Sequence, residues 1–281
     1  MSTAILWFRQ DLRLADNPAL AAALDRCEQV IPLYTHAPGE SGTWQPGAAS
    51  NWWLHHSLLA LDRSLRDLGS RLVIRVGPAL DTLRKLAAET GARQVFWNRL
   101  YEPAHIERDK RVKLALREDG LSVESFNAAL LFEPWEMSKA DRAPYRVFTP
   151  FWKSCVRAGL PCALHDAPTQ MPAVPAPLSS LNIEDLALLP TLPWDGGLRS
   201  TWQVGEQAAL ENLQRFAQGS MAAYHEERNR PDLQATSRLS PHLHFGEVGP
   251  RQVVAACTRE GETKGGTVFL SEIGWREFAH H

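Results

Sequence analysis

The chain has 281 residues, of which 44% are hydrophobic and 22% charged, and this composition predicts a globular protein long enough for two domains. The formal net charge of −2 does not suggest nucleic-acid binding, and residues 201–281 carry 8 Lys and Arg against 10 Asp and Glu, so any contact with DNA would need a local patch. The sequence has no signal-peptide pattern and no apolar run of membrane length, which predicts a cytoplasmic protein without a membrane contact.

Short apolar runs alternate with amphipathic stretches over residues 1–132. The runs that predict strands span residues 4–8, 30–34, 72–76, 95–97 and 121–126. The stretches that predict helices span residues 18–26, 52–68, 79–89 and 105–118. Asn17 before Pro18 marks a helix start, and Gly69, Gly91 and Gly120 mark helix ends. This alternation predicts an α/β fold with a doubly wound five-stranded parallel sheet, whose ligands bind beyond the carboxyl ends of the strands.

Charged and polar side chains crowd the segment after the first predicted strand, which contains Arg9, Asp11, Arg13, Asp16 and Asn17. One interpretation is a salt-bridged turn that ends in a helix cap. The other is a ligand site at the carboxyl edge of the sheet. Neither a G-x-G-x-x-G motif nor a P-loop follows any predicted strand, so an ordinary dinucleotide or ATP site is not supported.

The pattern changes after residue 132. Seven of the nineteen prolines fall between residues 161 and 193, which predicts an extended interdomain linker over residues 133–200. From residue 201 the pattern is helical, and Trp202, Ala209, Leu213 and Phe216 are predicted to form one core stripe. The four cysteines show no CxxC spacing and no histidine at metal-ligand spacing, which predicts reduced thiols and no metal site.

One helical stripe near the end of the chain carries several chemically useful side chains. Phe269, Glu272, Trp275, Arg276 and Ala279 fall within about 120° of one another on a helix. Such a stripe can line a cleft with a stacking surface, a hydrogen-bond acceptor and a fixed cation. The alternative is a core helix with an internal Glu272–Arg276 pair at i, i+4 spacing.

A hydroxyl-rich loop precedes this helix by about one helical hairpin. It consists of Thr236, Ser237, Arg238, Leu239 and Ser240, and it opens a predicted helix. Hydroxyls, backbone N–H groups and a guanidinium at a helix start suit a phosphate group. The alternative is that Ser237 is a plain helix cap without a ligand.

Four segments, residues 7–17, residues 148–152, residues 236–240 with Gly246, and residues 272–278, occur in this order along the chain. Together they resemble the motifs of the DNA photolyase/cryptochrome family, and most of all those of bacterial class I cyclobutane pyrimidine dimer photolyases. The resemblance implies an α/β domain of the antenna type (residues 1–132), the linker, and the N-terminal part of an all-helical domain (residues 201–281). That helical domain would bind FAD in a folded, U-shaped conformation.

The resemblance also implies roles for individual residues. The implied cofactor-binding set is Tyr224, Thr236, Ser237, Arg238, Leu239, Ser240, Phe269, Glu272, Arg276 and Ala279. In the implied catalytic pair, Trp275 stacks on a flipped-out pyrimidine dimer and Glu272 hydrogen-bonds its carbonyl and imide edge. The implied DNA-binding set is Arg228, Glu272, Trp275 and Arg276.

The implied activity is that of a deoxyribodipyrimidine photo-lyase, a carbon–carbon lyase. Excited reduced FAD donates one electron to a cyclobutane pyrimidine dimer in UV-damaged DNA, the ring splits, and the electron returns. Such an enzyme is expected to be a cytoplasmic monomer with no obligate protein partner. The resemblance leaves the choice between cyclobutane and 6-4 lesions open.

Two departures from the family pattern affect what is expected. Phe269 stands where the family often has tryptophan, so stacking is retained without an indole N–H. Ala104 and His105 stand where the folate-binding branch has Asn-Glu. The antenna chromophore is therefore left open between methenyltetrahydrofolate, a deazaflavin and none.

The sequence stops inside a predicted helix, at His281, without a cap. We therefore expect a truncated chain that lacks the other wall of the FAD cavity and the tryptophan relay, and that is inactive alone. Two rival functions remain. One is a cryptochrome, a flavin photoreceptor that signals without repair, and the other is a nucleotide-binding α/β protein without flavin.

Overall fold

The computed structural model describes residues 2–40, 42–139 and 143–281. Its N-terminal part contains a five-stranded parallel sheet with the strand order β3-β2-β1-β4-β5. The strands are β1 (Thr3–Phe8), β2 (Gln29–His36), β3 (Val73–Val76), β4 (Gln94–Asn98) and β5 (Ser122–Phe126). The predicted doubly wound α/β fold is confirmed. Its strand order reverses between β1 and β4, where such sheets form a ligand crevice.

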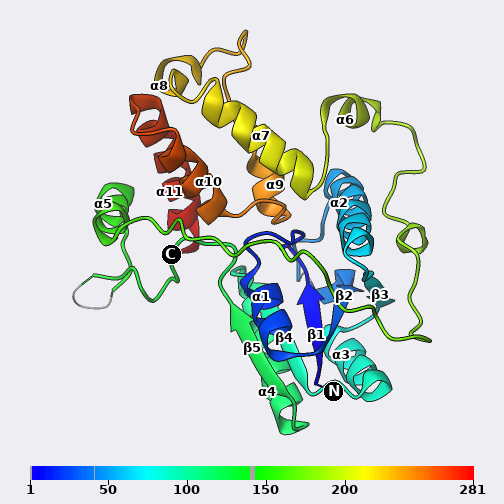
Figure 1. Ribbon diagram of the computed structural model, residues 1–281. Helices are drawn as coiled ribbons and strands as arrows, with labels where there is room; N and C mark the ends of the chain where they lie inside the picture. The colour runs from blue at the N-terminus through cyan, green and yellow to red at the C-terminus, as the bar shows by residue number, and fades with distance from the viewer. Residues whose placement is uncertain (1, 41, 140–142) are drawn as a thin grey trace.

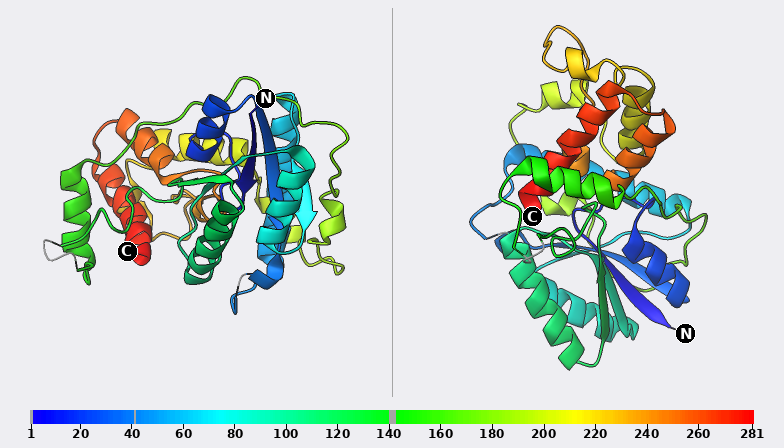
Figure 2. Two further views of the ribbon diagram at one scale, coloured as in Figure 1. Left: turned by 90° about the horizontal axis from the view of Figure 1, so that it is seen from below. Right: turned by 90° about the vertical axis from the view of Figure 1, so that its left-hand side faces the viewer.

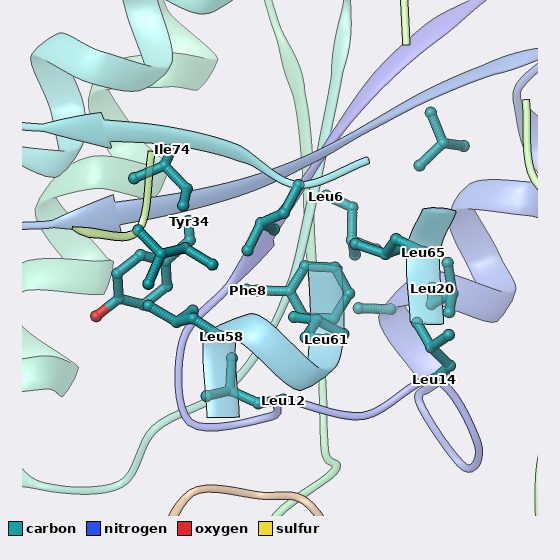
Figure 3. Packing of buried hydrophobic residues seen from close by; sticks show 14 of the residues in the cluster. Leu6, Phe8, Leu12, Leu14, Leu20, Tyr34, Leu58, Leu61, Leu65 and Ile74 are labelled. Atoms are coloured by element: carbon teal, nitrogen blue, oxygen red, sulfur yellow. The ribbon is translucent and has the colours of Figure 1, made fainter. Parts of the chain in front are cut away.

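Helices cover both faces of this sheet (Figures 1 and 2). They are α1 (Pro18–Arg26) and α2 (Ala48–Asp67) on one face, and α3 (Ala79–Thr90) and α4 (Pro103–Glu118) on the other. Leu6 and Phe8 of β1 belong to the core beneath α1 and α2 (Figure 3), whereas Ile5 and Trp7 belong to the opposite core. Because successive residues enter two buried faces, the strand is an unbroken apolar run that the sequence pattern could locate.

The chain after β5 first forms a helix and then runs back along the α/β unit. Its elements are α5 (Phe148–Ala158), the 3-10 helix η2 (Glu184–Leu186) and α6 (Gly196–Thr201). Residues 159–183 contain no regular element. The backbone N–H of Met171 donates to the Leu68 carbonyl at 2.8 Å, and that of Leu181 donates to the Ile74 carbonyl at 3.1 Å. The proline-rich segment is therefore packed against the sheet unit.

The remaining chain is helical and has its own hydrophobic core. Its helices are α7 (Glu206–Gln218), α8 (Tyr224–Glu227), α9 (Ser240–His244), α10 (Pro250–Arg259) and α11 (Lys264–His280). Ala209, Leu213 and Phe216 form the predicted core stripe of α7, but Trp202 lies before this helix, at the end of α6. Among the described residues, no helix is both long enough and apolar enough to cross a membrane.

The charged segment after β1 joins the sheet unit to the helical part. The buried Arg13 guanidinium donates to the carbonyl oxygens of Gly246 (3.0 Å), Asp16 (2.8 Å) and Ala128 (2.9 Å). Asp16 in turn pairs with Arg251 at 3.1 Å. Gly246 has φ +66°, and a Cβ at this position would lie 2.1 Å from a backbone carbonyl of the sheet unit. This close approach requires glycine.

The remaining side chains of that segment form a turn and a cap. The Arg9 guanidinium pairs with Asp109 at 2.8 Å, and the Asn98 amide donates to Asp11 at 2.6 Å. Asn17 is the N-cap of α1, as predicted. The interpretation as a salt-bridged turn with a helix cap therefore holds for Asp11 and Asn17, whereas Arg9 also lines a cavity.

Candidate functional site

A cavity of about 510 Å³ lies between the 236–240 loop, α8, α11 and the residues that follow β4. We call it the loop cavity. Its walls contain every residue of the predicted cofactor-binding set except Ala279, namely Tyr224, Thr236, Ser237, Arg238, Leu239, Ser240, Phe269, Glu272 and Arg276. The fold thus gathers residues that lie far apart in the sequence around one space.

Several lining residues of the loop cavity were not predicted. They are Gln10, Leu100, Tyr101, Glu102, Ala129, Leu243, His244, Ile273 and His280. Gln10 and the residues after β4 come from the carboxyl edge of the sheet, where the strand pattern predicted ligands but the sequence analysis named other side chains. His280 lies one residue after Ala279 on α11, and the sequence alone does not show which of the two faces the cavity.

The 236–240 loop presents polar groups to this cavity. Thr236 and Ser240 are exposed and Ser237 is half-buried. The Ser237 hydroxyl accepts from the N–H of Leu239 at 3.4 Å, and Leu239, not Ser237, is the N-cap of α9. Because α9 spans only Ser240–His244, its dipole adds little, and the predicted contribution of a helix start to anion binding is weak here.

Arg238 supplies the positive charge of the loop. Its backbone is left-handed, with φ 52°, and its guanidinium lies 4.2 Å from the centre of the Trp202 ring. Within the part of the chain that the structure describes, no carboxylate pairs with it. An uncompensated cation beside three hydroxyl side chains suits an anionic group such as a phosphate.

The polar side chains of α11 reach outward from the helix. The Glu272 carboxylate accepts a hydrogen bond from Arg228, which also lies 5.3 Å from the centre of the Tyr224 ring. Arg276 donates to the Ala129 carbonyl at 2.6 Å. The internal Glu272–Arg276 pair of the alternative interpretation is therefore replaced by contacts to other segments, which favours the cleft-lining interpretation of α11.

The predicted stripe on α11 divides into two faces. Phe269 and Arg276 turn to the cavity side of Glu272, because helix positions advance by about 100° per residue. Trp275 and Ala279 turn to the other side and do not line the loop cavity. The Trp275 indole is 50% exposed and Ala279 is exposed as well. Sequence spacing placed these residues on one stripe but could not fix which part of it faces the cavity.

Burial adjusts the pKa of several groups around the loop cavity. It lowers the pKa of His244 and of His280, which keeps both imidazoles neutral near pH 7. A hydrogen bond from His105 lowers the pKa of Glu102 to about 2, so this carboxylate is ionised. Burial also raises the pKa of Tyr224, which keeps its hydroxyl protonated. The cavity thus presents neutral rings together with a few fixed charges.

A second cavity of about 1030 Å³ lies at the carboxyl edge of the sheet, and we call it the sheet cavity. Arg9 lies 4.3 Å from the centre of the Trp7 ring, and Arg108 lies 5.0 Å from the same ring. The Trp7 indole nitrogen and the Arg9 Nε are buried without a hydrogen-bond partner among the described residues. The predicted neighbourhood for an additional ligand therefore contains unused donors.

The two cavities adjoin each other. The residues that line both are Gln10, Leu100, Glu102 and His244. Ala104 and His105, where the family pattern departs, line the sheet cavity. No group of three or more His, Cys, Asp or Glu side chains suited to a metal occurs among the described residues.

Comparison with known proteins identifies the family. The model of the DNA photolyase family matches residues 4–176. The chain belongs to this family. It is 43% identical over 281 residues to the deoxyribodipyrimidine photo-lyase of Agrobacterium fabrum, with 99% of this chain and 58% of that protein covered. It is 37% identical over 296 residues to Cryptochrome-1 of Arabidopsis thaliana, with 99% of this chain and 42% of that protein covered.

A solved structure of a photolyase has nearly the same fold. The crystal structure of a bacterial class III photolyase from Agrobacterium tumefaciens superposes on this chain with a TM-score of 0.94 at 42% sequence identity. The match covers 100% of this chain and 58% of the chain in that crystal structure. The sequence motifs had suggested class I, whereas this similar photolyase is of class III. The chain thus spans about 58% of the length of these photolyases.

Proposed function

We propose that the photolyase-family chain binds FAD in the loop cavity and serves the light-driven repair of cyclobutane pyrimidine dimers in UV-damaged DNA. The observation that carries this proposal is the convergence of the 236–240 loop and α11 on one cavity. The proposal includes the division into an α/β antenna domain (residues 1–132), a linker (residues 133–200) and the first part of a FAD domain (residues 201–281). It also includes a cytoplasmic monomer that acts on UV-damaged DNA without an obligate protein partner.

The residues of the loop cavity fit FAD. Its volume of about 510 Å³ lies in the usual range for small-ligand sites. The 236–240 loop contributes hydroxyls and Arg238, which has no carboxylate partner among the described residues, and these groups suit phosphates. Helix α11 contributes Phe269, which is buried with its ring centre 4.5 Å from that of Phe216 and 5.3 Å from that of Tyr224. Phosphates and an aromatic ring system both have partners in this cavity. When bound, FAD supplies light-driven transfer of one electron to the dimer.

Glu272 and Arg228 are the residues proposed to act on the dimer. The Arg228 guanidinium holds the Glu272 carboxylate at the edge of the loop cavity. A carboxyl group held there can hydrogen-bond the carbonyl and imide edge of a pyrimidine and stabilise negative charge on the reduced dimer if it carries or shares a proton. Arg228 and Arg276 remain the proposed cations for nearby phosphates or flavin, with Arg276 fixed by the Ala129 carbonyl.

Trp275 is proposed as the stacking surface for the flipped-out dimer. Extruding a damaged pair costs a few kcal/mol, and stacking on an aromatic side chain returns roughly 1–3 kcal/mol per base. The half-exposed indole beside Glu272 offers such a surface just outside the loop cavity. Within the predicted cofactor set, Ala279 keeps only a proposed role, since it lies outside the cavity walls.

The sheet cavity is the proposed place of an antenna chromophore. It shares a wall with the loop cavity, so a chromophore bound there would lie next to FAD. The Arg9 and Arg108 guanidinium groups beside Trp7 suit a flat, anionic molecule. Methenyltetrahydrofolate and a deazaflavin both have this character. The sheet cavity does not choose between them.

The test of the repair function uses the longest natural polypeptide that contains this chain. We expect it to bind flavin and to split thymine dimers in a synthetic duplex under blue light, as measured by chromatography of the digested DNA. Glu272→Ala should reduce dimers split per absorbed photon more than it reduces DNA affinity, because its partner exists mainly after electron transfer. Glu262→Ala, an exposed glutamate outside both cavities, is the matched control.

A cryptochrome function is the second candidate, and the 37% identity to Cryptochrome-1 of Arabidopsis thaliana supports it. A photoreceptor would bind flavin and change its absorption in light, yet leave thymine dimers intact. That combination would replace repair with signalling in the proposal. Failure to bind any flavin would instead favour the flavin-free nucleotide-binding protein.

A further inference from the structure

Three aromatic rings from two helices form a parallel stack that ends at Trp275. The rings of Trp152 and Phe148, both on α5, have centroids 6.3 Å apart and planes 11° apart. The rings of Phe148 and Trp275 have centroids 3.9 Å apart and planes also 11° apart. We call these three residues the ring stack. Figure 2 shows α5 lying across the outside of α11, which brings the two helices together at this stack.

The contact between α5 and α11 leaves no room for a side chain at Gly274. A Cβ atom at Gly274 would lie 2.4 Å from the Trp152 ring, so the indole rests directly on the backbone of α11. Phe278 closes one side, with its ring edge-on to Phe148 at 6.0 Å and to Trp275 at 6.0 Å. The Trp152 ring of the stack therefore packs on the backbone of α11, and the Phe278 ring packs edge-on against the other two rings.

The ring stack is most exposed to solvent at its Trp275 end. Phe148 and Trp152 are partly buried, whereas the Trp275 indole is 50% exposed. Phe148 covers one face of this indole at stacking distance. An exposed tryptophan on a helix surface would otherwise exchange between rotamers, and ordering it would cost part of any binding energy gained on its surface.

We propose that Phe148 and Trp152 are positioning residues that hold the Trp275 indole in one orientation and leave its other face ready for a flat ring. The identification of that ring as a flipped pyrimidine rests on the proposed function. The positioning of the indole does not, because it follows from the stack itself. Phe148 therefore contributes to the selection of damaged DNA without touching it.

A merely structural role for Phe148 makes a different prediction. If the ring only fills space between α5 and α11, any apolar side chain of similar size will serve. If its flat face orients the indole, leucine will fail and tyrosine will succeed. Phe151 provides the matched control, since it is fully buried on the same helix and contacts Phe278 at 5.3 Å without stacking on Trp275.

The first experiment is fluorine NMR of this chain labelled with fluorotryptophan, without flavin or DNA. The Trp275 signal is assigned by its loss in Trp275→Phe. Phe148→Leu should remove the ring-current shift of this signal and broaden it, Phe148→Tyr should preserve both, and Phe151→Leu should leave the signal unchanged. A Trp275 signal that is the same in Phe148→Leu as in the unmodified chain would overturn the proposal.

The second experiment measures the affinity of the longest natural polypeptide for a duplex with one thymine dimer and for the same duplex undamaged. Phe148→Leu should reduce the preference for damage roughly two- to tenfold, and Phe148→Tyr should retain it. In a Trp275→Ala background, Phe148→Leu should cause no further loss. An equal loss in Phe151→Leu would assign the effect to the docking of α5 and refute a role of the ring.

The two experiments separate the two proposals. If Trp275→Ala leaves the preference for damaged DNA unchanged, the repair function assigned to Trp275 fails. The NMR result still decides whether Phe148 orients the indole, because it needs no DNA. If the signal responds to Phe148→Leu and the preference for damage responds as well, the positioning and the lesion-binding role of the stack are both supported.

Discussion

Glu277 should make the stability of the fold depend on pH near neutrality. Its carboxylate is fully buried on α11 and accepts backbone N–H groups of Leu131 at 2.8 Å and Phe132 at 3.3 Å through one oxygen. Its other oxygen is buried without a hydrogen-bond partner among the described residues. Burial raises the pKa of Glu277 from 4.5 to about 7. The nearby Arg276 opposes this rise but does not cancel it.

The direction of the effect follows from the raised pKa. The folded protein binds this proton more tightly than the unfolded chain, so the free energy of unfolding is highest when the carboxyl group is protonated in both states. Stability is therefore present below the ordinary pKa of glutamate and is lost as pH rises through the folded value of about 7. A rise from 4.5 to about 7 corresponds to a loss of about 3 kcal/mol across this window.

Glu277→Gln tests this reasoning because an amide has the same shape and does not ionise. Urea unfolding of both proteins between about pH 5 and about pH 8 should show the variant gaining up to about 3 kcal/mol relative to the unmodified chain as pH rises. Placing an amide N–H₂ beside Arg276, 3.8 Å away, has a cost that does not depend on pH, so it offsets the whole profile of the variant without changing this gain. His281, 4.0 Å from the carboxylate, and Cys155 occur in both proteins, so their direct titration cancels in the difference.

An exposed glutamate provides the control for this measurement. Glu262→Gln should give a profile parallel to that of the unmodified chain, because its carboxyl group is exposed in the folded state. A constant difference between the Glu277→Gln and unmodified profiles over the whole pH range would refute the argument. It would mean that the buried carboxyl group titrates near its ordinary pKa, for which water would have to reach it.

Three further substitutions test the loop and the joint between the two parts. Arg238→Ala in the longest natural polypeptide should weaken FAD binding by about 1.5–3 kcal/mol, with little change in the flavin spectrum; a lower melting temperature at unchanged flavin affinity would assign Arg238 to structure alone. Gly246→Ala should destabilise the fold by several kcal/mol more than Gly91→Ala. Both glycines have positive φ, but only Gly246 lies against the Gln10 carbonyl. Equal losses of stability in urea unfolding would contradict this prediction. Arg13→Met should lower the free energy of unfolding by roughly 3 kcal/mol or more, because it leaves buried carbonyl groups without a donor. Arg13→Lys should restore only part of this stability, since one ammonium group cannot reach all three carbonyls. Full rescue by lysine would argue against that geometry.

Local signals in the sequence predicted the sheet unit well. The central strand β1 is buried on both faces, so its apolar run is unbroken. Asn17 and Gly91 mark helix ends through backbone chemistry that acts within a few residues. The 236–240 loop was located because hydroxyl side chains are unusual in such density. These features need no knowledge of distant contacts.

Local sequence patterns could not predict contacts between segments that lie far apart in the sequence. Arg13 and the Gly246 carbonyl are separated by 233 positions, and nothing near Arg13 in the sequence indicates where its guanidinium will be buried. The partner of Glu272 is 44 positions away at Arg228, whereas helical spacing suggested its neighbour Arg276. The i, i+4 rule describes an isolated helix, and tertiary partners displaced it here.

The division of α11 into two faces follows from what packs beside it. On one side, the 236–240 loop and α8 leave a cavity that Phe269 and Glu272 enter, and on the other side α5 covers the helix backbone at Gly274. A single helix thereby presents a carboxylate to the loop cavity and an indole to solvent. If the proposed function is correct, this arrangement lets one base stack outside while its polar edge points inward. The ring stack and the loop cavity would then be two halves of one recognition site, joined through consecutive turns of α11.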